Sequence, residues 1–101
     1  MNPNRRDYFD AINRAALASF EILVARWLPD GRREGNEWTA RNPRRADRNV
    51  GSFKVNLRNG KWADFATGDK GGDPISLAAY LGGLSQSEAA RRLAECLGIR
   101  P

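Results

Sequence analysis

The hydrophobic and polar positions of this chain follow two different periods, and the change of period divides the sequence into three parts. Between residues 5 and 28 the apolar side chains recur at the spacing of one helix face. Pro29 and Gly31 follow the pattern and would stop a helix. We therefore predict one long amino-terminal helix over residues 5–28, whose apolar face is formed by Phe9, Ile12, Ala16, Phe20, Leu23, Val24 and Trp27.

The middle part, residues 36–67, changes to the two-residue period of a β-strand. A polar linker leads to a short strand around residues 37–41, in which Trp38 is the expected anchor. After a loop over residues 42–51, apolar and polar residues alternate, as in a half-buried strand. The apolar positions of that strand are Phe53, Val55 and Leu57.

The dipeptide Asn59–Gly60 predicts a β-hairpin in the centre of this sheet. It favours a two-residue type I′ turn, because both central positions of that turn need a positive φ. The returning strand is residues 61–65. This register pairs Leu57 with Trp62, Val55 with Asp64, and Phe53 with Ala66, and it places Lys54, Arg58 and Lys61 on the opposite face.

Two helices are predicted over residues 73–98. Asp73 is a suitable N-cap and Pro74 suits the first helical position. Ser85 and Glu88 form a capping-box pattern for a second helix that runs to Leu97. The chain is thus expected to be one α+β domain over residues 1–101, with a long amino-terminal helix, a small antiparallel sheet with a central hairpin, and two carboxy-terminal helices.

The composition makes several classes of site improbable. The chain has no histidine and a single cysteine, Cys96, so it lacks the usual zinc ligands and the usual general base. We assign no catalytic residue and expect no cofactor. There is no run of about 18 apolar residues and no signal-peptide pattern at the amino end. The expectation is a soluble cytoplasmic protein that does not bind a membrane.

The positive charge is concentrated in the middle of the chain. The net charge is +5, and residues 26–61 contain ten Lys/Arg but only four Asp/Glu. A concentrated basic region, mostly arginine, suits a polyanion such as nucleic acid. The alternative from charge alone is a solvated basic surface.

The stretch GDKGGD, residues 68–73, and the two helices after it admit several interpretations. The loop precedes a helix, where anions bind, but it lacks the patterns GxxxxGK[S/T] and GxGxxG. The helices joined by GGLS have the outline of a helix-turn-helix, in which Arg91 and Arg92 would reach DNA. The other interpretation of the helices is an ordinary αα-hairpin.

Several short motifs occur together in a characteristic order. They are Trp38, Asn42–Arg45, Gly51–Val55, Asp64–Gly68 and Gly71–Asp73. In this order, over roughly residues 28–99, they resemble the zinc-ribbon domain at the amino end of bacterial, phage and plasmid DNA primases. That resemblance implies a ribbon-like sheet followed by helices, and a role in engaging template without catalysis.

The sequence departs from that family at the metal ligands. The resemblance places Asn42, Arg45, Asp64 and Thr67 where the family has zinc ligands, so a metal-free ribbon is implied. Our hypothesis is that Arg45 and Asp64 form a charged hydrogen-bonded pair, with Asn42 and Thr67 as neutral partners. The alternative is that Asp64 and Thr67 are only turn residues.

Taken together, the resemblance and the charge pattern predict a non-catalytic domain that contacts single-stranded DNA in replication or priming. Two alternatives remain at this point: an interaction module that docks on a primase or helicase, and a regulator that reads duplex DNA through residues 85–97. Phe65 or Trp62 would stack on bases, although Trp62 is expected in the core. The residues expected to bind phosphates are Arg44, Arg45, Arg48, Lys54, Arg58 and Lys61.

Overall fold

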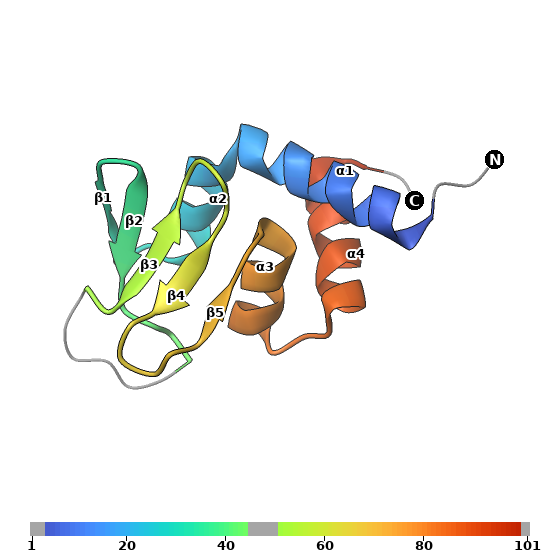
Figure 1. Cartoon of the computed structure of the whole chain (residues 1–101). Helices are drawn as coiled ribbons and strands as arrows, with labels where there is room; N and C mark the ends of the chain where they lie inside the picture. Colours follow the sequence, from blue (N-terminus) through green and yellow to red (C-terminus); the bar gives the residue numbers. More distant parts are fainter. Residues whose placement is uncertain (1–3, 45–50, 100–101) are drawn as a thin grey trace.

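The computed structural model describes residues 4–44 and 51–99, and within them the chain is an α+β protein (Figure 1). Its elements, in chain order, are helices α1 (Arg5–Ala18) and α2 (Phe20–Trp27), strands β1 (Arg32–Glu34), β2 (Glu37–Ala40), β3 (Phe53–Asn56), β4 (Trp62–Asp64) and β5 (Lys70–Gly71), and helices α3 (Pro74–Gly82) and α4 (Gln86–Leu97). All neighbouring strands are antiparallel and lie in sequence order, which makes the sheet a meander.

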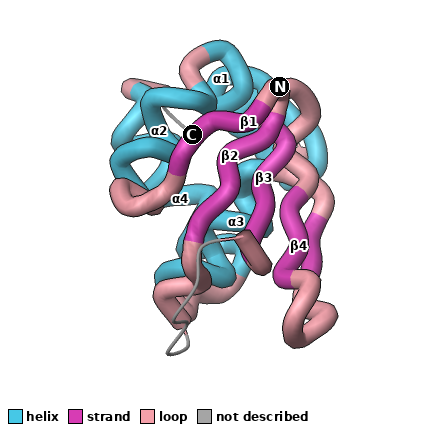
Figure 2. Tube along the Cα trace, turned by 90° about the vertical axis from the view of Figure 1, so that its left-hand side faces the viewer, coloured by secondary structure: helices cyan, strands magenta, loops and turns pink. Residues whose placement is uncertain are grey.

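The sheet is covered by helices on one face only. Figure 2 looks onto the sheet from its free side, and the helices lie behind it. In Figure 1, α1 spans the top of the molecule from the sheet to α4, and α3 lies between them. The core between sheet and helices is apolar and contains, among others, Ile12, Phe20, Val24, Leu28, Phe53, Val55, Ile75 and Leu77.

The amino-terminal helix is divided in two, so the prediction of one helix over residues 5–28 was wrong. Ser19 lies between α1 and α2 with φ −132° and ψ 33°, outside the helical range. Its backbone N–H still bonds to Ala16 and Leu17, which closes α1, and its carbonyl accepts the N–H of Leu23 in α2. The apolar positions of both helices nonetheless reach the core, because the bend turns α2 toward the sheet.

The central hairpin is present, but its predicted register was wrong by two residues. Phe53 pairs with Asp64 and Val55 pairs with Trp62, so the loop is four residues long. The Asn56 side chain accepts the backbone N–H groups of residues 58 and 59 and starts a turn there. Within this loop only Gly60 has a positive φ, of 81°, so the type I′ turn over Asn59–Gly60 does not form. A shift of two residues keeps the strand faces, which is why the buried face was predicted correctly.

Two strands lie outside the predicted limits of the sheet. β1 pairs with β2 through a two-residue loop whose first residue, Gly35, has φ 63°. This Gly–Asn loop is a recognisable hairpin signal. The second additional strand, β5, has only two residues and pairs with β4. The sheet therefore extends over residues 32–71 rather than 36–67.

The two carboxy-terminal helices form as predicted. The Asp73 side chain accepts the N–H of Ser76, and the Ser85 hydroxyl accepts the N–H of Glu88. Gly83 and Gly98 end the helices in the left-handed conformation. The second half of the predicted capping box differs, because the Glu88 carboxylate bonds to Arg91 and Arg92 of its own helix. None of the helices in the described part of the chain is both long and apolar enough to cross a bilayer.

Thr39 gives a first test of this packing. Its side chain is 2% exposed, and its hydroxyl has no hydrogen-bond partner among the described residues. Since a buried unsatisfied hydroxyl costs about 1 kcal/mol or more, Thr39→Val should stabilise the protein by about 1 kcal/mol and raise the melting temperature by roughly 4 °C. Thermal denaturation followed by circular dichroism measures the shift. The exposed Thr67, whose hydroxyl accepts the N–H of Asp69, is the matched control, and Thr67→Val should give no gain. An unchanged or lower melting temperature for Thr39→Val would contradict the prediction.

Candidate functional site

The helix-free face of the sheet contains a shallow groove with several lysines. Lys54, Ala63 and Lys70 lie in one row across β3, β4 and β5. Because neighbouring strands are about 4.8 Å apart, the two lysines are roughly 10 Å apart at the backbone, with the small Ala63 between them. Lys61 and Asn56 form the next row toward the hairpin loop. We call this site the lysine groove; it has a volume of about 300 Å³ and is lined chiefly by Lys54, Asn56, Lys61, Ala63, Phe65 and Lys70.

The three lysines of this groove differ from Arg32, Arg33, Arg41, Arg91 and Arg92 in forming no ion pair with a described residue. Within residues 4–44 and 51–99, none of the three ammonium groups forms an ion pair. Glu37 is the acid that lines the groove, so the local balance stays positive. Elsewhere, Arg33 pairs with Glu21. The lysine groove therefore carries positive charge that is available to a ligand.

Phe65 adds an exposed aromatic ring to the edge of the lysine groove. It is 71% exposed, although its backbone N–H donates to the carbonyl of Ser52 at 2.8 Å. The turn that follows is closed by two backbone bonds between Asp64 and residues 68 and 69, each of 2.8 Å. A large apolar side chain on a fixed backbone is thus exposed to solvent beside three lysines.

Behind this turn lies a buried polar network. Asn42 follows β2 and Asp64 ends β4, and both side chains are almost fully buried, at 1% and 0% exposed. The Asn42 amide nitrogen donates to Asp64 at 2.9 Å and to the hydroxyl of Tyr80 at 2.7 Å. Tyr80 in turn donates to Asp69 at 2.8 Å, and the second Asp64 oxygen accepts the N–H of Ala66 at 2.8 Å. The network joins β2, β4 and α3.

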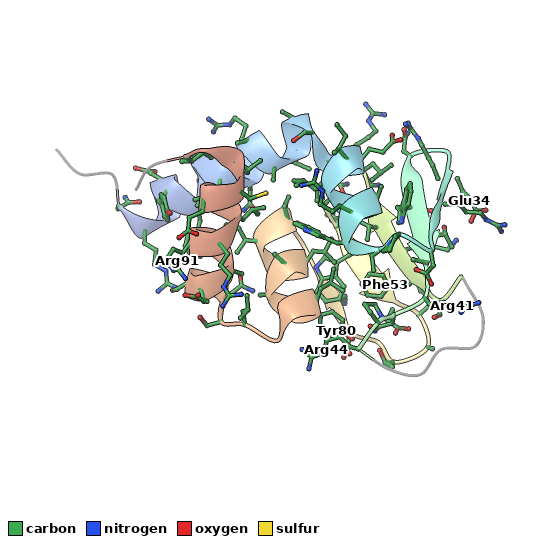
Figure 3. The ribbon with its side chains drawn as sticks, turned by 180° about the vertical axis from the view of Figure 1, so that it is seen from behind. Glu34, Arg41, Arg44, Phe53, Tyr80 and Arg91 are labelled. Atoms are coloured by element: carbon green, nitrogen blue, oxygen red, sulfur yellow. The ribbon has the colours of Figure 1, made fainter. Side chains whose placement is uncertain are left out.

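Tyr80 links this network to the aromatic core. Its ring lies 4.6 Å from that of Trp62 and 6.1 Å from that of Phe53, centre to centre. Burial raises the pKa of the Tyr80 hydroxyl, and the neighbouring Asp69 raises it further. The phenol therefore stays protonated and keeps its hydrogen bond to Asp69. Arg44 lies next to Tyr80 in Figure 3, with its guanidinium carbon 5.6 Å from the ring centre, and it donates to the Tyr80 carbonyl at 2.9 Å.

The arrangement of Asn42 and Asp64 does not fit a zinc ion. Both hydrogens of the Asn42 amide point at acceptors in the network, and its oxygen accepts the N–H of Arg44 at 2.8 Å. Donor hydrogens repel a cation, and the thiolates and imidazoles that bind zinc are missing here. No group of three His, Cys, Asp or Glu suited to a metal occurs among the described residues.

Part of our hypothesis for this region is visible in the network. Asn42 and Asp64 are bonded to one another, whereas Arg45 lies outside the described residues, so its predicted pairing with Asp64 stays a prediction. Thr67 was expected as a neutral partner of that pair, and this was wrong. Thr67 is exposed, and its hydroxyl accepts the N–H of Asp69 within the turn.

The helix that would read duplex DNA has its arginines neutralised. Arg91 bonds to Glu88 and Glu95, and Arg92 bonds to Glu88 at 3.0 Å. The hydrogen bond from Arg91 is the main reason that the pKa of Glu88 falls to about 2. The apolar side of α4 is buried against α1 and α3, as in an αα-hairpin.

The phosphate-binding residues predicted from sequence therefore do not form one cluster. Lys54, Lys61 and Phe65 come together in the lysine groove, and Trp62 lies in the core, as expected. Arg44 lies against α3 instead. The prediction that Arg58 shares a face with Lys54 and Lys61 was wrong, because the longer hairpin loop places Arg58 in another groove. Arg48, like Arg45, lies outside the described residues. Sequence reasoning missed Lys70, because no strand pattern marks the two residues of β5.

Comparison with known proteins adds no relative: no protein-family model and no curated protein matches this chain.

Proposed function

We propose that this chain is a non-catalytic domain that binds single-stranded nucleic acid, in particular single-stranded DNA, through the lysine groove. The observation that carries the proposal is the group of three lysines that form no ion pair with any described residue, beside the exposed ring of Phe65. Proteins that bind single strands combine positive charge along the backbone with aromatic side chains on which bases stack.

The shape of the site favours a single strand over a duplex. Stacking on Phe65 requires an unpaired base, because paired bases expose only their edges. The lysine row also spans only about 10 Å, which suits one backbone better than the two backbones of a duplex. The duplex-regulator alternative receives no comparable support, since Arg91 and Arg92 are bonded to carboxylates.

A role in replication or priming, next to a primase or helicase, is the biological setting that we propose. Its support is the ordered set of motifs that resembles the primase zinc ribbon, together with the Asn42–Asp64 bond at two ligand-equivalent positions. The network would hold the strands of such a ribbon together without a metal ion. It also anchors the turn that carries Phe65.

Fluorescence anisotropy with labelled oligothymidine and with a duplex of equal length tests the proposal. Wild-type protein should prefer the single strand, and its affinity should fall steeply with salt.

Phe65→Ala should weaken binding about tenfold, because stacking of one base contributes about 1–3 kcal/mol. Ile22→Ala is the matched control, since Ile22 is 65% exposed but lies outside the lysine groove. Absence of single-strand preference, or equal losses in the two variants, would refute the proposal. A duplex preference that is lost on changing Arg91 and Arg92 to Ala would favour the regulator instead.

A further inference from the structure

A second groove lies between the bend of the amino-terminal helices and the tips of both hairpins. Ser19 ends α1 there, and α2 then runs beside the sheet, so that the chain bounds a hollow of about 650 Å³. Pockets that hold small-molecule ligands have volumes of roughly 300–1,000 Å³, so this hollow is large enough for several side chains of a partner. We call this hollow the α2 groove; it shares no lining residue with the lysine groove.

The lining of the α2 groove is largely apolar and partly exposed. Ile22 is 65% exposed, and in the described part of the chain it and Phe65 are the two large apolar residues that are exposed. Beside it, Leu17, Trp38 and Leu57 line the groove and are only half-buried. Side chains from two helices and two hairpins thus form one contiguous apolar surface, which is typical of an interaction site rather than of scattered surface residues.

The charges around the α2 groove indicate the chemistry of its occupant. Glu21 lines the groove but is already paired with Arg33. Arg58 also lines it, and its guanidinium has no hydrogen bond or ion pair within residues 4–44 and 51–99. The groove therefore has one surplus positive charge beside an apolar floor. A bound segment should bring apolar side chains together with a carboxylate.

We infer that the α2 groove binds an apolar peptide segment of another protein, with an Asp or Glu that pairs with Arg58. A nucleic-acid strand fits less well, because a single free cation neutralises a single phosphate. A second copy of this chain also fits less well, because an isologous contact would bring the same surplus positive charge to both sides. The inference does not depend on the proposed nucleic-acid binding.

Selection from a displayed library of random peptides, followed by anisotropy with the selected peptides, tests this inference. The peptides should share apolar residues and at least one Asp or Glu. Ile22→Asp should abolish their binding, and Arg58→Ala should weaken it about 10- to 100-fold, as expected for a hydrogen bond to a charged group. Arg26→Ala is the matched control, because Arg26 is exposed and lines neither groove, and it should leave binding of the selected peptides unchanged. Melting curves check that each variant is folded, which is expected because Ile22 and Arg58 are exposed.

A charge exchange makes the test specific for Arg58. Arg58→Glu should lose the acidic peptide, and replacing the acid of that peptide with Lys should restore binding to this variant. Failure to recover any peptide that depends on Ile22, or absence of rescue, would overturn the inference. Loss of oligothymidine binding in Ile22→Asp would overturn it in favour of nucleic acid. A dimer in sedimentation analysis that dissociates on the same change would overturn it in favour of a second copy.

Discussion

Asp64→Ala is expected to lower the free energy of unfolding by about 3 kcal/mol, because it leaves a buried and a part-buried donor without this acceptor, each at a cost of about 1–3 kcal/mol. Its donors include the Asn42 amide at 2.9 Å and the N–H of Ala66 at 2.8 Å, and Asp64 itself is fully buried. The melting temperature should fall by roughly 15 °C. Chemical denaturation and thermal denaturation followed by circular dichroism measure the two quantities.

Asp69→Ala is the control that separates this effect from simple loss of a carboxylate. Asp69 belongs to the same network, through the Tyr80 hydroxyl, but its residue is exposed. Water can replace its hydrogen bond, so this variant should lose about 1 kcal/mol or less. Equal stability of the two variants would mean that the buried network does not stabilise this end of the sheet.

Replacing Lys54, Lys61 and Lys70 together with alanine should weaken binding to oligothymidine about 100-fold at about 0.1 M salt. Each phosphate contact on a single strand adds about 0.7 to the slope of log K against log salt, which corresponds to about fivefold in affinity at this salt concentration. The slope itself should therefore fall by about 2. Anisotropy titrations across a salt series measure both values, and melting curves show whether the variant is folded.

The matched control removes three positive charges elsewhere. Arg32, Arg91 and Arg92 lie outside the lysine groove, and each is paired with a carboxylate. Their replacement with alanine changes the net charge equally but should alter the affinity only a fewfold. Similar losses in both triple variants would mean that binding follows net charge rather than this groove.

The features that sequence predicted correctly are those decided by a few neighbouring residues. The caps at Asp73 and Ser85 depend on one side chain and the N–H groups next to it. The prediction of the hairpin register failed for an equally local reason, because the turn starts at Asn56 and not at Asn59–Gly60. The break at Ser19 has no local signal, since Ala, Ser and Phe are all tolerated in a helix.

The candidate site divides in the same way. Lys54, Lys61 and Phe65 were predictable because they follow the alternation of the hairpin and the residues just after it. Lys70 was not, because β5 exists only through its pairing with β4. The position of Arg44 depends on Tyr80, which is 36 residues further along the chain, and contacts of that separation leave no pattern in a single sequence.

Because the strands of the sheet follow sequence order, the entropy cost of closing loops during folding is smaller for the sheet than for the contact between α1 and α4. Each strand of the meander pairs with the next strand along the chain, so its contacts close short loops at a small cost. The contact between α1 and α4 joins opposite ends of the chain, and its hydrogen bond from Arg5 to Ser87 spans 82 residues. Since α1 also contributes Ile12 and Ala16 to the core, its docking is the long-range closure that joins the sheet and the helical pair into one cooperative unit.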